Sequence, residues 1–136
     1  MSDTRERRTM VEVPQTGDEI PQADNWRVLQ SYCADQFDAA SAKKIEEAYA
    51  FAAKFHRNQR RRSGEPYINH PVEVALILAR DLHMDEDSIC AALLHDTVED
   101  TPATLDDVRE NFGESVAEIV DGVTKLTSIH VASMDE

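Results

Sequence analysis

Two pairs of ionisable residues, His95-Asp96 and Glu99-Asp100, lie one helical turn apart in the second half of the chain. At 100° per residue in a helix, the four side chains would share one arc of about 140°. The same segment carries a separate apolar stripe formed by Ala91, Leu94 and Val98. One helix would therefore present a packing face beside an ionisable face.

This ionisable face has two interpretations. Charged side chains at a helix end are often simply solvated. However, three carboxylates near a helix C-terminus oppose the negative end of the helix dipole, at a cost of about 0.3–1 kcal/mol per exposed charge. A bound cation would offset that cost. Imidazole and carboxylate suit a borderline metal such as Mn²⁺, Fe²⁺ or Zn²⁺, and a His-Asp pair leaves positions open for water and substrate.

Two further histidines are candidates to complete a ligand set. His70 directly precedes Pro71, where a helix is expected to begin, so the helix start would orient its side chain. Taken alone, His70 would more often be a capping or core histidine. His56 ends the apolar face of the preceding helix, and we expect it to be a packed histidine.

A cluster of arginines precedes His70. Four of the 14 basic residues fall within six positions, at Arg57, Arg60, Arg61 and Arg62, and Ser63-Gly64 follows them. Cations at a helix end can be merely solvated, where they complement the helix dipole. Guanidinium groups also bind phosphate oxygens in a forked manner and stack on nucleobases. An arginine loop beside a metal would therefore suit a phosphorylated nucleotide.

The charge is distributed unevenly along the chain. The formal net charge is −13, with 12 acidic and 12 basic residues in 1–80, and 15 acidic but only 2 basic residues in 81–136. An acidic surface repels nucleic acids and anionic membranes and attracts divalent cations, so neither nucleic acid nor membrane is an expected partner. No apolar run approaches the roughly 20 residues that span a bilayer. We expect a cytoplasmic protein with Cys33 and Cys90 as reduced thiols.

The spacing of apolar residues predicts an all-α fold, and no strand pattern is present. Aromatic residues make up only 6% of the chain, which favours closely packed helices rich in Ala, Val, Ile and Leu. Residues 1–24 are expected to form a disordered or loosely docked tail before one domain at 25–136. Helices are expected over 26–37, 41–58, 71–83, 85–100, 104–111 and 115–126.

Particular residues mark these helices. Thr104 is expected to cap the helix that follows it, and Gly113 to separate this helix from the last one. The helix over 71–83 is expected to bury Val74, Ala75, Ile77 and Leu78.

Three ordered motifs resemble the hydrolase domain of the RelA/SpoT homologue family, whose members belong to the HD superfamily. They are RRSGEPYINHP at 61–71, AALLHDTVEDT at 91–101, and Phe112-Gly113 followed by VDGVTKL at 120–126. The resemblance extends over about residues 42–126.

The resemblance implies a helical HD domain that uses Mn²⁺ to remove the 3′-pyrophosphate of (p)ppGpp, giving GDP or GTP and pyrophosphate. The implied metal ligands are His70, His95 and Asp96. The implied catalytic carboxylates, which would handle the attacking water and its proton, are Glu99 and Asp100. The implied nucleotide contacts near the base are Arg61 and Ser63. His56 is not a ligand in this pattern.

The chain departs from the family at one point. A later segment resembling Leu-Ala-Asp-Arg-Leu-His-Asn supplies a further Asp ligand in the family, and no such segment occurs before Glu136. We therefore expect a C-terminally incomplete HD domain from a longer protein that could also carry a synthetase domain. The alternatives are a non-catalytic nucleotide-binding or regulatory module, and an HD phosphohydrolase with another nucleotide substrate. The sequence does not predict the oligomeric state.

Overall fold

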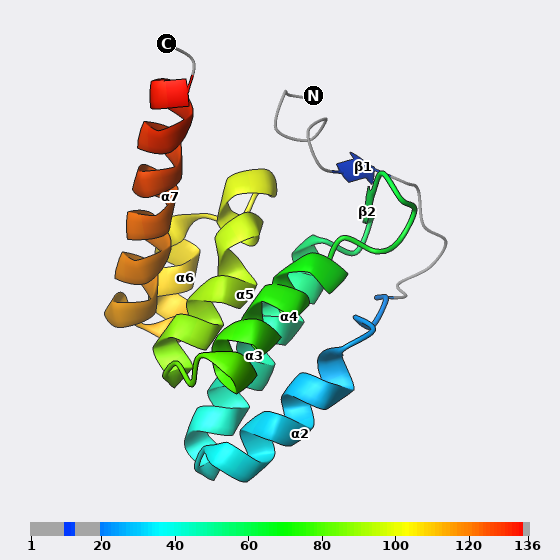
Figure 1. Ribbon diagram of the computed structural model, residues 1–136, viewed down its shortest axis with the longest axis vertical. Coiled ribbons are helices and arrows are strands. Elements are labelled where there is room, and N and C mark those ends of the chain that lie inside the picture. The colour runs from blue at the N-terminus through cyan, green and yellow to red at the C-terminus, as the bar shows by residue number, and fades with distance from the viewer. Residues whose placement is uncertain (1–9, 13–19, 135–136) are drawn as a thin grey trace.

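The computed structural model describes residues 10–12 and 20–134, and it confirms the predicted all-α architecture. Figure 1 shows α5 between α7 on one side and α3 and α4 on the other. The elements are, in order, β1 (Met10–Glu12), α2 (Trp26–Gln36), α3 (Ala39–Phe55), β2 (Gln59–Arg61), α4 (Asn69–Leu76), the π-helix η1 (Ile77–Asp81), α5 (Glu86–Asp100), α6 (Leu105–Phe112) and α7 (Glu114–Met134).

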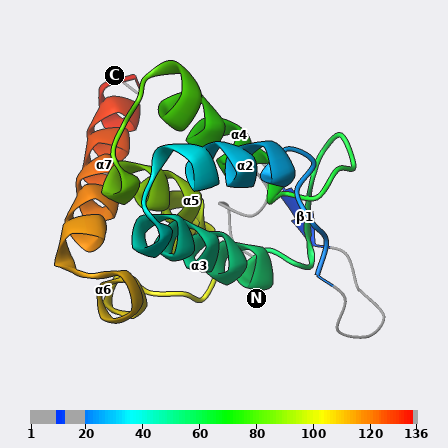
Figure 2. The same cartoon turned by 90° about the horizontal axis from the view of Figure 1, so that it is seen from below.

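Helix α5 is the central element of the bundle, and it packs against α3, α4 and α7. The view from below in Figure 2 shows the same helix surrounded by its neighbours. Its apolar side chains Ile89, Leu93 and Leu94 are completely buried. Small residues on α3, such as Ala48 and Ala52, are also completely buried and let the two helices approach closely.

Side-chain caps set several helix starts. The Asp85 carboxylate accepts a hydrogen bond from the Ser88 N–H (3.0 Å) at the start of α5. Thr104 caps α6 as predicted, and Asp107 bonds back to the Thr104 N–H to complete a capping box. Gly113 separates α6 from α7 with a φ of +100°, a conformation that favours glycine.

The prediction that the chain contains no strand is wrong for two short segments. Strands β1 and β2 pair antiparallel, with Val11 opposite Arg60. Strands of three residues that pair through the backbone are too short to show a side-chain periodicity. Strand β1 falls within the predicted tail, and residues 1–9 and 13–19 of that tail lie outside the described residues.

The helix predicted over 71–83 also differs in detail. It begins at Asn69, two residues before Pro71, and becomes the π-helix η1 at Ile77. A π turn contains more residues than an α turn and shifts the phase of the following side chains. Ile77 is 49% exposed and not buried as predicted, because the buried face of this segment is formed by Val72, Ala75, Leu76 and Ala79. The last helix, α7, begins at Glu114 and continues beyond the predicted end at 126.

Within the described residues, no helix is both long enough and apolar enough to cross a membrane.

Cys33 and Cys90 are free and buried, as expected of reduced thiols. Burial raises the pKa of Cys33 to about 11 and that of Cys90 to about 12. Both thiols should therefore stay protonated at pH 8 and react slowly with a disulfide reagent such as DTNB, because the thiolate is the reactive form. Spectrophotometric titration should show fast reaction of both only in denaturant. Rapid labelling of either thiol in the native protein would contradict this packing.

Candidate active site

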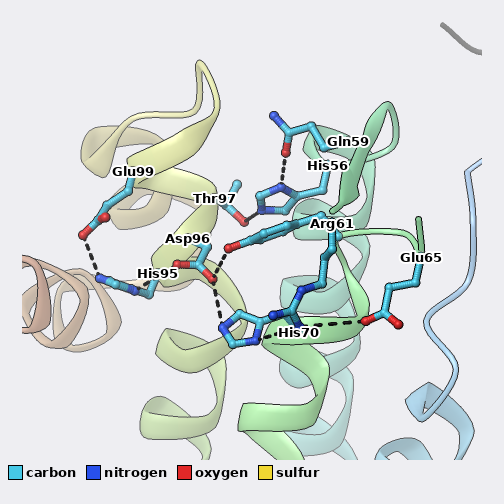
Figure 3. Close-up of polar contacts among 10 residues, drawn as sticks. His56, Gln59, Arg61, Glu65, His70, His95, Asp96, Thr97 and Glu99 are labelled. Atoms are coloured by element: carbon cyan, nitrogen blue, oxygen red, sulfur yellow. Dashed lines mark hydrogen bonds and ion pairs between the residues drawn. The ribbon is translucent and has the colours of Figure 1, made fainter. Parts of the chain in front are cut away.

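His70, His95 and Asp96 meet where α4 packs against α5. His70 lies in the first turn of α4, and its Nε2 is 3.8 Å from Asp96 Oδ2. His95 Nδ1 lies 3.5 Å from Asp96 Oδ1. Figure 3 shows the Asp96 carboxylate between the two imidazole rings. The structure thus brings the three predicted ligands together, with one imidazole beside each carboxylate oxygen.

The surroundings of Asp96 keep it ionised. Burial opposes ionisation, but contacts with His95, His70 and Tyr67 outweigh it and hold the pKa of Asp96 below its ordinary value. The same contact with Asp96 raises the pKa of His95 against the opposing effect of burial. A carboxylate already in its charged form is ready to bind a cation.

The residues fit a divalent metal in chemistry and spacing. Two ligands bound to one ion at about 2.1 Å each are separated by about 3 to 4 Å, which covers both imidazole-to-carboxylate distances. Among the described residues, no three His, Cys, Asp or Glu side chains already converge on one point. One reason is that the His95 ring turns towards Glu99, with Nε2 2.9 Å from Glu99 Oε2. That buried Nε2 has no well-aligned hydrogen bond within the described part of the chain.

The two predicted catalytic carboxylates have different positions. Glu99 lies beside His95, one turn from Asp96, with a side chain that is 19% exposed. Asp100 is the last residue of α5 and is buried, and its backbone carbonyl accepts a hydrogen bond from Gln59 Nε2 (3.2 Å). Glu99 thus contacts a predicted metal ligand, His95, directly.

The arginine loop is a tight turn that follows β2. The Arg61 N–H donates to the Glu65 carbonyl (2.9 Å), and the Gly64 N–H donates to the Arg61 carbonyl (2.8 Å). Gly64 has a φ of +98°, which strains any other residue. The Arg61 guanidinium contacts His70 Nδ1 (3.4 Å) and lies 3.8 Å from the Glu65 carboxylate. Arg61 thus contacts one of the predicted metal ligands, His70, whereas Ser63 lies at the exposed tip of the turn.

Tyr67 is a site residue that sequence reasoning missed. It is 3% exposed, and its hydroxyl donates to Asp96 Oδ2 (3.1 Å). Tyr67 lies in the motif that contains His70, three residues before it, but its partner is 29 positions away in the chain. Only its place beside His70 could have indicated this role.

An apolar cavity of about 430 Å³ adjoins the two histidines and Asp96. Val74 and Leu78 of the α4–η1 segment line it together with Ile119 and Val123 of α7. Val74 and Leu78, which were predicted to be buried, therefore form a wall of this cavity. A cavity with apolar walls and a polar end suits a ligand with an apolar body and a charged group.

Comparisons with known proteins show which sequences this chain is similar to. The sequence model of the HD domain family matches residues 48–136. The chain is 53% identical over 92 residues to a guanosine-3′,5′-bis(diphosphate) 3′-pyrophosphohydrolase of Aquifex aeolicus, covering 68% of this chain and 13% of the relative. It is 47% identical over 103 residues to the bifunctional (p)ppGpp synthase/hydrolase SpoT of Escherichia coli, covering 76% and 14%.

Two further similarities extend the comparison. A GTP pyrophosphokinase of Streptomyces coelicolor is 49% identical over 94 residues, covering 69% of this chain and 11% of the relative. A solved structure of a metazoan SpoT orthologue that hydrolyses ppGpp is 40% identical, with a TM-score of 0.57, covering 63% of this chain and 48% of that one.

The chain thus spans only 11 to 14% of the length of these three curated relatives. The relatives confirm the RelA/SpoT resemblance that the three motifs indicated. Since the family model matches more than half of the residues, the chain belongs to the HD domain family.

Proposed function

We propose that this chain forms the N-terminal portion of a Mn²⁺-dependent phosphohydrolase that removes the 3′-pyrophosphate of ppGpp or pppGpp. Water is consumed, and the products are GDP or GTP and pyrophosphate. The observation that carries the proposal is the Asp96 carboxylate flanked by His70 and His95, with Arg61 contacting His70. The relatives named as ppGpp hydrolases support this choice of substrate.

Each residue has a physical role in the proposal. His70, His95 and Asp96 would hold the metal, which lowers the pKa of bound water and polarises a phosphoryl oxygen. Glu99, beside His95, would accept a proton from the attacking water, and Asp100 would assist at the end of the same helix.

The arginine loop would bind the nucleotide. The Arg61 guanidinium can form paired hydrogen bonds to phosphate or stack on the base, and the Ser63 hydroxyl at the exposed tip can hydrogen-bond to it. The positive charge of Arg61 would attract the nucleotide's phosphates, which the second half of the chain, with 15 acidic and 2 basic residues, repels.

We also propose that the natural protein is a cytoplasmic enzyme of greater length with a pyrophosphokinase domain. The support is that the relatives include a bifunctional synthase/hydrolase and a GTP pyrophosphokinase, both much longer than this chain. The part described here would supply the hydrolytic half of such an enzyme.

Replacing the central ligand tests the hydrolytic proposal. In the natural-length protein with Mn²⁺, Asp96→Asn should lower ppGpp hydrolysis by about 100-fold or more, because a neutral amide binds the metal weakly. Released pyrophosphate provides the readout. Glu73→Gln, on an exposed position of α4, is the matched control and should retain wild-type activity.

The outcomes separate the alternatives. Tight ppGpp binding without turnover in the wild-type protein would replace the hydrolase by a non-catalytic nucleotide-binding module. Turnover of other nucleotides but not ppGpp would leave an HD phosphohydrolase with a different substrate.

A second prediction concerns the arginine loop. Arg61→Ala should raise the KM for ppGpp by about 10-fold or more, because a hydrogen bond between charged groups contributes about 1.5–3 kcal/mol. Steady-state kinetics should be compared with Arg80→Ala, which removes an exposed arginine from η1. A KM within twofold of wild type for Arg61→Ala would show that this loop does not bind the nucleotide.

A further inference from the structure

A chain of buried polar groups lies beneath the candidate active site, outside the predicted ligand set. His56, at the C-terminal end of α3, bonds through Nδ1 to Gln59 Oε1 and through Nε2 to Thr97 Oγ1 (3.1 Å). Gln59 Nε2 in turn donates to the Asp100 carbonyl (3.2 Å). The exposed fractions of His56, Gln59 and Thr97 are 1%, 6% and 0%. Figure 3 shows His56 between Gln59 and Thr97.

The hydrogen bonds among these buried groups each have a defined donor and acceptor. Gln59 uses its amide N–H₂ on the Asp100 carbonyl, so its oxygen faces His56 and can only accept. His56 therefore carries its proton on Nδ1, and Nε2 accepts from the Thr97 hydroxyl. Burial lowers the pKa of His56, against the opposing effects of Gln59 and Asp96, in agreement with a neutral ring.

The polar chain links the end of α3 to two elements that carry candidate site residues, β2 and α5. His56 ends α3, Gln59 begins the strand β2 that leads into the arginine loop, and Thr97 and Asp100 belong to the last turn of α5. Thr97 directly follows Asp96, and Asp100 directly follows Glu99. Buried polar groups are costly unless they are paired, so the three elements cannot shift independently without losing these bonds.

A second contact extends the link to the metal ligands. The His56 and Tyr67 rings lie 5.0 Å apart between centroids, and the Tyr67 hydroxyl donates to Asp96 Oδ2. His56 thus contacts the residue that orients Asp96, in addition to the turn that carries Glu99.

We propose that His56 is a positioning residue for the hydrolytic site, acting with Gln59 and Thr97. Their hydrogen bonds fix the last turn of α5 against the arginine loop, so that Glu99 keeps its place relative to Asp96. This role rests on the proposed function, because it requires a reaction that Glu99 assists. It gives the buried histidine a purpose beyond packing.

Two substitutions at Thr97 test the proposal. Thr97→Val keeps the shape but removes the hydroxyl, whereas Thr97→Ser keeps the hydroxyl. In the natural-length protein with ppGpp and Mn²⁺, Thr97→Val should lower kcat by about 10-fold or more, as is usual when a supporting partner of a metal site is lost. The KM and the half-saturating Mn²⁺ concentration should stay within twofold. Thr97→Ser should retain most of the wild-type kcat.

The outcomes decide between positioning and simple packing. A Thr97→Val protein that is folded by circular dichroism and has wild-type kcat would overturn the proposal. Equal loss in Thr97→Val and Thr97→Ser would also overturn it, because a variant that keeps the hydroxyl would then be as impaired as one that lacks it. If Thr97→Val does not fold, Gln59→Met removes the bonds to the Asp100 carbonyl and to His56 Nδ1 and should lower kcat in the same way.

A separate readout distinguishes failure of this inference from failure of the proposed function. Histidine ¹⁵N NMR of the wild-type protein should show a neutral His56 with its proton on Nδ1. A proton on Nε2 would overturn the proposal even in an active enzyme. Absence of ppGpp hydrolysis in the wild-type protein would instead overturn the proposed function, and the positioning role with it.

Discussion

The Asp96 carboxylate must remain ionised although its side chain is only 19% exposed. Burial alone would favour the neutral acid. The charge is retained because His70, His95 and Tyr67 surround the two oxygens, and these residues come from the start of α4, from α5 and from the loop after β2. The bundle therefore has to hold the start of α4, the helix α5 and the loop after β2 in fixed positions around the Asp96 carboxylate. The completely buried side chains of Ile89, Leu93 and Leu94 anchor α5 in the bundle and provide the rigid support.

The negative charge of the second half of the chain also affects the site, at longer range than the contacts around Asp96. Residues 81–136 carry 15 acidic and 2 basic side chains, so the field around α5 and α7 repels a polyphosphorylated nucleotide. A bound divalent cation and the Arg61 guanidinium would supply the local positive charge that such a ligand needs. Arg61 lies beside His70, where the two contributions would reinforce each other.

Local patterns in the sequence predicted the bundle and most of the site. The apolar face of α5, the Thr104 cap and the grouping of His70 with His95-Asp96 follow from helical periodicity and short motifs. The exposure of Ile77 did not follow, because the apolar residues of this segment fit more than one helical face and the buried one contains Ala75, Leu76 and Ala79. The bonds from Gln59 and Tyr67 to α5 join residues 41 and 29 positions apart, and no local pattern encodes such pairs.

The central claim is that His70, His95 and Asp96 together bind one Mn²⁺ ion. Anomalous diffraction at the manganese absorption edge, from crystals grown with Mn²⁺, tests it most directly. We expect a single strong peak at about 2.2 Å from one nitrogen of each histidine and from an Asp96 oxygen, which requires the His95 ring to turn away from Glu99. A strong peak elsewhere, or none at these three side chains, would contradict the account.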